Sequence, residues 1–233
     1  MHKHRVGLLG IVIGVTALGC SKELPQVAVD TTAGTKPSAA LPTPPERDSA
    51  TGRLAMRTEA QQHFDKAREA LRLKDPKAMA TALRAAAVVV RQQTDSAADD
   101  AKARLDAVAH ELDTLARRAE GGAQLAANRL NLLFASANQA EAERHQRRSV
   151  DALILRDTLR AAEDMLMAVD HLERAARDAK IPLDKSALAV ANSARALGAD
   201  LLDRHAPGQR SIQAVQDSLG REIHQFGTRI RRR

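Results

Sequence analysis

Apolar residues recur every three to four positions from Thr51 onward, which is the spacing of one buried face of an α-helix. No stretch alternates apolar and polar residues with the period of two that a half-buried strand requires. The valine run at 88–90 is strand-like, but the helical pattern of 83–87 leads directly into it, so we expect helix there too. The chain is therefore predicted to be all-α. The clearest helical stripes are Leu105, Val108, Leu112 and Leu115, and Leu155, Leu159, Ala162, Leu166 and Val169 with Ile154, Met165 and Leu172 beside them.

Turn-forming residues divide the helical region. The Asp-Pro pair at 75–76 separates two helices, and the Thr-Asp-Ser run at 94–96 supplies good N-cap residues for a third. The two glycines at 121–122 form the best hairpin turn in the chain, because glycine readily takes the left-handed conformation that ends many helices. Prolines mark two later breaks. We expect helices at 52–74, at 76–93, from the 94–96 cluster to 120, within 123–180, at 184–205 and at 209–230.

Residues 123–180 contain no Gly or Pro, so two interpretations are open. They form one very long helix, or they form two helices that break near 147–149 with Ser149 as the N-cap. The double glycine allows 52–120 to fold back along this segment, with 184–230 as a third layer. We expect an antiparallel helical bundle of elongated form. The alternative is a compact bundle of six or seven short helices.

The composition narrows the classes of function. The 233 residues include three Phe and no Tyr or Trp, which leaves little for base stacking or aromatic cages. One cysteine cannot form an internal disulfide or hold a metal cluster alone. The sequence contains no HExxH, no GxSxG, no phosphate-binding Gly-rich loop and no CxxCH haem motif. We therefore expect no enzyme activity, no catalytic residue and no cofactor.

The first twenty residues read as an export signal. A positively charged start precedes an uncharged apolar run at 6–18, which is too short to span a membrane about 30 Å thick. Its end, Thr-Ala-Leu-Gly-Cys at 16–20, resembles the lipobox of bacterial lipoproteins, with Ala17 where Leu is commonest. The resemblance implies cleavage before Cys20, a diacylglycerol on its thiol and an acyl chain such as palmitate on its amine, and such multiple chains anchor a protein stably. The alternative is an unlipidated signal peptide with an incidental cysteine.

A linker follows the proposed lipid anchor. In Gram-negative lipoproteins an Asp after the cysteine typically keeps the protein in the inner membrane, so the resemblance with Ser21 indicates the outer membrane, facing the periplasm. Five of the eight prolines lie among Thr, Ser, Ala and Gly before position 52, a composition typical of flexible linkers. The predicted organisation is a signal peptide at 1–19, a lipidated cysteine and linker at 20–51, and a helical domain at 52–233.

One set of ligand-type side chains recurs every seven residues, and it consists of Asp157, Asp164, His171 and Asp178. Such a stripe can bind a divalent ion, especially if a second helix supplies His110 or Glu111. It lies about 120° around the helix from the apolar stripe, and its neighbours are about 10.5 Å apart along the axis, too far to share an ion. We therefore expect a solvated face and no metal. The histidines at 63, 145, 205 and 224 are also expected at the surface or its boundary.

Positive charge is concentrated at the C-terminus. Two units of the formal +7 belong to the signal peptide, and the last 13 residues hold five Arg against one Glu. Anionic lipid headgroups, lipopolysaccharide phosphates or an acidic envelope protein suit such a surface, whereas export argues against nucleic acid. Alternatively, the arginines complement the macrodipole at the end of a helix. The residues expected to contact an anionic surface are Arg229, Arg231, Arg232 and Arg233.

These patterns together predict a membrane-anchored lipoprotein of the cell envelope. Its helical domain is expected to act in binding or scaffolding, with the membrane as one partner and an envelope protein or anionic lipid as another. The alternative is a helical bundle that binds a metal ion or another small ligand.

Overall fold

The computed structural model describes residues 59–94, 99–203 and 208–233. These residues form seven helices and no strand, in agreement with the predicted all-α bundle. The predicted signal peptide, Cys20 and the linker lie outside the described residues. None of the described helices is both long enough and apolar enough to cross a membrane. The helices are α2 (Glu59–Arg72), α3 (Pro76–Thr94), α4 (Asp99–Glu120), α5 (Ala127–Ile154), α6 (Thr158–Ala179), α7 (Lys185–Leu202) and α8 (Gln209–Arg231).

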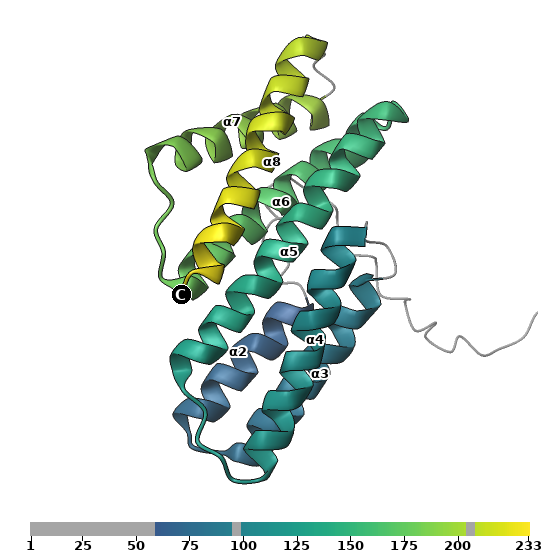
Figure 1. Ribbon diagram of the computed structural model, residues 1–233. Helices are drawn as coiled ribbons and strands as arrows, with labels where there is room; N and C mark the ends of the chain where they lie inside the picture. The colour runs from purple at the N-terminus through teal and green to yellow at the C-terminus, as the bar shows by residue number, and fades with distance from the viewer. Residues whose placement is uncertain (1–58, 95–98, 204–207) are drawn as a thin grey trace, which may run out of the picture. The chain divides into compact units, whose positions relative to one another are not determined.

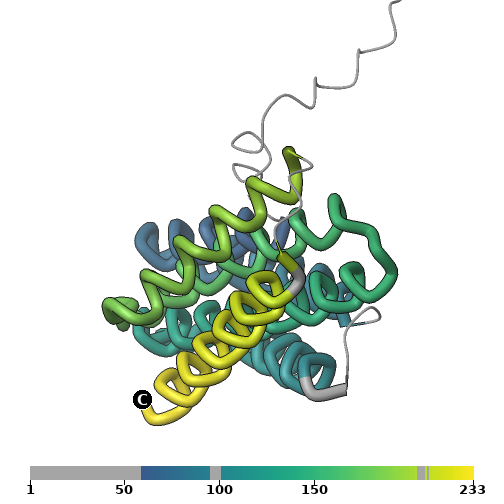
Figure 2. The backbone as a smooth tube through the Cα atoms, turned by 90° about the horizontal axis from the view of Figure 1, so that it is seen from above, coloured from purple at the N-terminus to yellow at the C-terminus, as the bar shows by residue number. Residues whose placement is uncertain are grey.

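Helix α5 runs between two groups of helices (Figure 1). On one side α2, α3 and α4 pack against each other in chain order, and the turn at Gly121 and Gly122 brings α4 back along α5. On the other side α6 returns along α5, α7 packs on α6, and α8 packs on α5 and α7 (Figure 1, Figure 2). The fold-back at the double glycine is therefore present. Residues 123–180 form two antiparallel helices, which is the second of the two interpretations, and not a single layer along which 52–120 folds back.

Two apolar clusters fill the two sides of α5. The first joins α2, α3 and α4 to the N-terminal half of α5, where Phe64 and Phe134 stack with ring centroids 4.3 Å apart. The second joins α6, α7 and α8, and its large side chains include Met165, Leu172 and Phe226. Alanine makes up much of both clusters, and its small side chain lets helices approach closely while burying little area. Stability therefore depends on long helical contacts and on a few large side chains.

The break between α5 and α6 lies at 155–157, later than the predicted 147–149. Helix α5 ends at Ile154, and Arg156 takes the left-handed conformation with a φ of 60°. The amides of Arg156 and Asp157 donate to the carbonyls of Leu153 and Ala152 in the last turn, an arrangement in which glycine usually occupies the left-handed position. The Asp157 side chain then accepts a hydrogen bond from the amide three residues on and caps α6.

Ser149, the predicted cap, lies buried inside α5. Its hydroxyl donates to the carbonyl of Ala161 and so joins α5 to α6. Because the break falls later in the chain, three members of the predicted apolar stripe stand at the turn or directly after it and are exposed, namely Ile154, Leu155 and Leu159.

Gly198 is a point of close approach between α7 and α6. A Cβ at this position would lie 2.9 Å from the branched Cγ of Leu166, which is itself buried. Gly220 in α8 is less constrained, since a Cβ there would lie 3.3 Å from the amide tip of Gln146. A branched buried side chain has less room to move than the end of a long one, so the packing of α7 requires glycine at 198.

Gly198→Ala should lower the free energy of unfolding by about 1–3 kcal/mol, because the new methyl group overlaps Leu166. The same change at Gly220 gains up to about 1 kcal/mol of helix propensity and meets a movable amide, so it should be close to neutral or stabilising. Urea unfolding followed by circular dichroism measures both changes. Equal effects of the two substitutions would contradict this packing of α7 on α6.

Candidate metal centre

The middle of α5 is buried although it carries many polar side chains. Asn138, Gln139, Glu141, Arg144 and His145 are all buried there. A buried polar group destabilises the fold unless a hydrogen-bond partner replaces the water that it loses. The partners of these side chains therefore show how the neighbouring helices must be placed.

The seven-residue series on α6 supplies several of these partners. Asp164 and His171 are 4% and 1% exposed, and the side chain of Asp178 is 12% exposed. The prediction of a solvated face is wrong for these three residues, because α6 packs against α7 with one face and against α5 with another. The polar stripe therefore meets α5 instead of water. Of the four residues in the series, only Asp157 is exposed, as the N-cap of α6.

Asn138 and His145 have the same seven-residue spacing on α5 and lie opposite this series. His145 Nδ1 lies 2.7 Å from a carboxylate oxygen of Asp164. His171 Nδ1 lies 3.0 Å from the amide oxygen of Asn138, whose amide nitrogen donates to Asp178 at 2.9 Å. The two imidazole rings stack with centroids 5.4 Å apart. We call these five residues the polar ladder.

The partners determine which nitrogen of each imidazole carries the proton. A carboxylate only accepts, so His145 Nδ1 donates to Asp164, and a guanidinium only donates, so His145 Nε2 accepts from Arg144. The amide nitrogen of Asn138 already donates within the polar ladder, so its oxygen accepts from His171 Nδ1. His171 Nε2 then keeps its lone pair. Both histidines therefore present an unprotonated Nε2.

Glu141 stands one turn before His145 on α5 and adds a carboxylate beside the two rings. One ligand-type atom from each of Glu141, His145 and His171 lies within 4.8 Å of the other two. All three residues are buried, which corrects the expectation that His145 lies near the surface. Glu141 Oε1 and His171 Nε2 have no hydrogen-bond partner in the described part of the chain, although such buried groups usually destabilise a fold by about 1–3 kcal/mol each. These three residues form the candidate metal centre.

Positive groups lie beside the candidate metal centre. Arg144 Nη2 donates to Glu141 at 2.7 Å and to His145 Nε2 at 3.1 Å. Burial lowers the pKa of His171 well below its usual value, and the guanidinium charges of Arg174 and Arg144 lower it further. A low pKa keeps the imidazole neutral, which is the form that binds a metal ion.

Two imidazole nitrogens and one carboxylate oxygen are a donor set that suits Zn²⁺, Cu²⁺ or Fe²⁺. Each ring also has an acceptor at Nδ1, Asp164 for His145 and Asn138 for His171, as is usual for metal-bound histidines. Ligand atoms around tetrahedral zinc are about 3.3 Å apart, so side-chain rotations would have to close the 4.8 Å spread. Three protein ligands would leave a fourth position for water or another small ligand.

Other side chains considered as ligands lie elsewhere. His110 is exposed on α4, and Glu111 pairs with an arginine at the start of α5. The second helix that contributes ligands is therefore α5 and not α4. His63 is half-buried and His224 is exposed, as expected, and His205 lies outside the described residues.

Glu141 and His145 are the site residues that the sequence pattern did not identify. Their four-residue spacing places them on one face of a helix, and His145 repeats the seven-residue spacing of α6 from Asn138. This shared spacing was the available signal. It becomes meaningful only when α5 and α6 are known to be antiparallel neighbours, because one continuous helix would hold the two series far apart.

The C-terminal arginines differ in their surroundings. The Arg229 guanidinium lies over the Phe226 ring, 5.0 Å from its centroid, and 3.3 Å from the carboxylate of Asp184, the N-cap of α7. Arg229 therefore packs within the bundle. The side chains of 231–233 are exposed and remain available for contact with an anionic surface.

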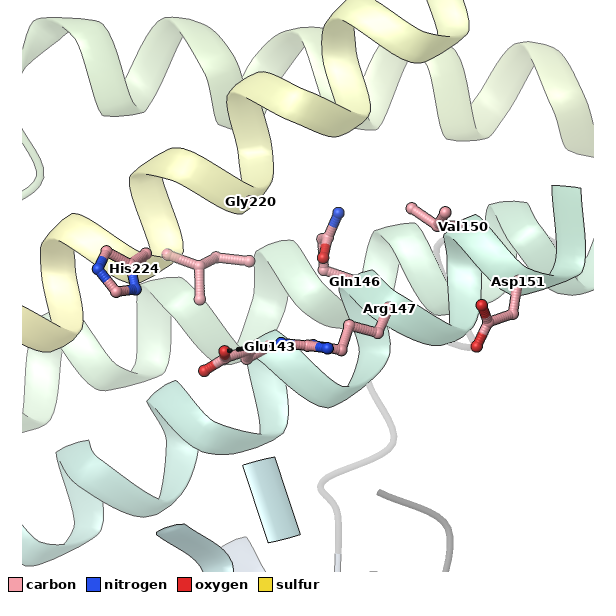
Figure 3. Close-up of a pocket in the computed structure, with 8 residues that line it drawn as sticks. Glu143, Gln146, Arg147, Val150, Asp151, Gly220 and His224 are labelled. Carbon is pink, nitrogen blue, oxygen red and sulfur yellow. Dashed lines mark ion pairs between the residues drawn. The ribbon is translucent and has the colours of Figure 1, made fainter. Parts of the chain in front are cut away.

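A groove of about 520 Å³ lies between α5 and α8 (Figure 3). Two of its charged residues are ion-paired, since Glu143 lies 2.6 Å from Arg104 and 3.8 Å from Arg147. Asp151 and His224 at its edge are exposed. Among the described residues that line the groove, none is a buried polar group without a hydrogen-bond partner, so the candidate metal centre remains the stronger site.

No protein-family model, no curated protein and no solved structure matches this chain.

Asp178→Asn should change the pH dependence of stability. Burial raises the pKa of Asp178 above its ordinary value of 3.8, although Arg68, Asn138 and Arg177 oppose the rise, and Asp65 adds to it. A raised pKa means that folding favours the protonated form, so this group stabilises the fold at low pH and loses that contribution as the pH rises through the raised pKa.

The free energy of unfolding of Asp178→Asn relative to wild type should therefore increase as the pH rises above 3.8. Urea unfolding of both proteins at a series of pH values measures this difference, and the subtraction removes the titration of other carboxyls. A difference that stays constant, or that falls as the pH rises, would contradict the assigned environment of Asp178.

Proposed function

We propose that this protein is an envelope lipoprotein whose helical domain binds a divalent transition-metal ion between α5 and α6. The observation that carries the proposal is the convergence of three buried ligand-type residues, Glu141, His145 and His171. Two of them carry a lone-pair atom without a hydrogen-bond partner in the described chain. A metal ion suits this arrangement because one cation can accept lone pairs from all three residues at once.

The rest of the polar ladder supports the same proposal. Asp164 and Asn138 hold the two imidazoles through Nδ1, and this leaves Nε2 of each ring as the ligand atom. His171 is the member of the predicted seven-residue series that would bind the ion directly. Asp164 would orient a ligand, and Asp178 would hold Asn138 in place.

The membrane anchor is proposed from the N-terminal sequence. The apolar run at 6–18 and the lipobox-like end at Cys20 resemble lipoprotein signals, and Ser21 favours the outer membrane. Acyl chains on the cysteine would hold the protein at the membrane, and the proline-rich segment at 20–51 would separate the helical domain from its surface. The exposed arginines at 231–233 would add contacts with anionic lipid.

A second candidate function is the binding or scaffolding of an envelope protein through a helix surface. The turn between α5 and α6 favours it, because Ile154 and Leu155 are 74% and 78% exposed there. Exposed apolar side chains that cluster are typical of contact sites. The two functions are compatible, since the turn lies at one end of the α5–α6 pair and the candidate metal centre lies within the pair.

The purified protein, without a histidine tag, should bind one Zn²⁺ per chain. His171→Gln should weaken binding by at least about 100-fold, because loss of a ligand should exceed the 10–100-fold effect of outer-sphere changes. Isothermal titration calorimetry measures the affinity, and titrations with Cu²⁺ and anaerobic Fe²⁺ rank the metals. Binding should also raise the Tm, because the unfolded chain does not hold the three ligands together.

His110→Gln is the matched control, since it replaces an exposed histidine of α4 by the same residue. It should bind Zn²⁺ as tightly as wild type. Equal losses in His110→Gln and His171→Gln, or unchanged binding in both, would contradict the assigned ligands. If wild type binds none of the three ions at micromolar concentration, the proposed metal function is wrong.

Cys20→Ser should abolish lipidation in a Gram-negative host. Wild type should incorporate labelled palmitate and sediment with membranes, whereas the variant should do neither because it lacks the acceptor thiol. Ser21→Asp should keep the label and shift the protein from outer to inner membrane fractions. Labelling of Cys20→Ser would contradict the proposed anchor, and an unchanged distribution of Ser21→Asp would contradict the sorting signal.

A further inference from the structure

We propose that the guanidinium of Arg144 holds the candidate metal centre in the absence of metal, and that a metal ion binds by displacing it. This inference rests on the proposed function and adds a competing internal cation to it. The two cations would be alternative occupants of one set of lone pairs.

The contacts of Arg144 show why the two occupants exclude each other. Its Nη2 lies 2.7 Å from Glu141 Oε2 and 3.1 Å from His145 Nε2, and its Nε donates to the same Glu141 oxygen at 3.0 Å. An imidazole nitrogen has one lone pair, so His145 Nε2 cannot accept a hydrogen bond from Arg144 and bind a metal ion at the same time. Arg144 must release His145 before the third ligand becomes available.

Charge strengthens this exclusion. The side chains of Arg144 and Glu141 are 7% and 4% exposed, so both charges lie in surroundings that screen poorly. One carboxylate can balance one guanidinium, but a divalent ion beside it would face strong repulsion. Movement of Arg144 away from Glu141 removes that repulsion and frees the Glu141 carboxylate to bind the ion.

The arrangement also explains how the protein can fold without metal. An uncompensated carboxylate in the core is strongly destabilising, and Arg144 provides the compensating charge for Glu141. The same arrangement selects among ions. An ion that bonds strongly to imidazole, such as Zn²⁺ or Cu²⁺, gains enough at the two histidines to replace the guanidinium, whereas Mg²⁺ prefers oxygen ligands and gains little.

Replacement of Arg144 by an uncharged residue of similar length tests the inference. Arg144→Met in the purified full chain should bind Zn²⁺ at least about tenfold more tightly than wild type, within the range of measured couplings between two binding events. Calorimetry with Zn²⁺ alone measures the change, and circular dichroism without metal checks that the variant folds. A residue with a purely structural role would show the opposite trend, because its loss would disorder the ligands.

Arg174→Met is the matched control. Arg174 is also buried and its charge also lowers the pKa of His171, but its Nε pairs with Asp170 at 2.7 Å and not with a residue of the candidate metal centre. Its replacement should improve Zn²⁺ affinity by less than about threefold. The variant removes only the repulsion between a distant positive charge and the ion, and it leaves the hydrogen bonds from Arg144 to Glu141 and His145 in place. Equal gains in the two variants would overturn displacement and leave general repulsion as the cause.

A measurement on wild type covers the case in which Arg144→Met does not fold. Nitrogen-15 NMR of arginine side chains should show one hydrogen-bonded Nε–H signal that shifts or broadens when Zn²⁺ is added. The conservative Arg144→Lys variant should lack this signal. If the Arg144 signal is unchanged at saturating Zn²⁺, the displacement is wrong.

The outcomes separate this inference from the proposed function. Zn²⁺ binding by wild type with no gain in Arg144→Met overturns the inference and leaves the proposed function intact. Binding by Arg144→Met alone would show that Arg144 excludes the ion and is not displaced by it, so the inference and the proposed function would both be wrong for wild type. If neither protein binds Zn²⁺, both are wrong.

Discussion

The structure depends on one constraint, which is that α5 must find partners for polar side chains in its buried middle. Asn138 and His145 can meet this requirement only if a second helix presents acceptors or donors at the same spacing. Helix α6 does so with Asp164 and His171, seven residues apart, in the antiparallel direction. A shift of α6 by one turn would leave these groups unsatisfied in the core, so the polar ladder determines the register of the central helix pair.

This register could not come from the apolar contacts alone. Much of the α6 surface near the polar ladder is alanine, including Ala161, Ala168 and Ala175, and neighbouring alanines on a helix offer nearly the same contacts after a slip. Buried ionic groups contribute little net stability, because their attraction mainly offsets the loss of water. We therefore infer that large side chains such as Phe64 and Phe134 supply stability, whereas the polar ladder supplies specificity.

The same arrangement creates the candidate metal centre. The hydrogen bonds that set the register use Nδ1 of both histidines, so Nε2 of each ring points away from these bonds. Glu141 adds a carboxylate beside the two rings. Helical bundles commonly place metal ligands on facing helices in this way. A structural network and a binding site thus share the same residues, and Arg144 connects the two roles because it satisfies Glu141 while the proposed ion is absent.

The sequence by itself determined the helical class and most helix ends, because both are local properties. Residues three and four apart share a helix face. A capping residue such as Asp75 or a turn glycine such as Gly122 ends or starts a helix through the backbone within a few residues of itself. The break at Arg156 escaped prediction because arginine seldom takes the left-handed conformation that it has here. Only the tertiary structure decided that the Asp164 and His171 stripe faces α5. Whether a stripe is buried depends on how many helices surround it, and that number is a property of the assembled bundle rather than of any one segment.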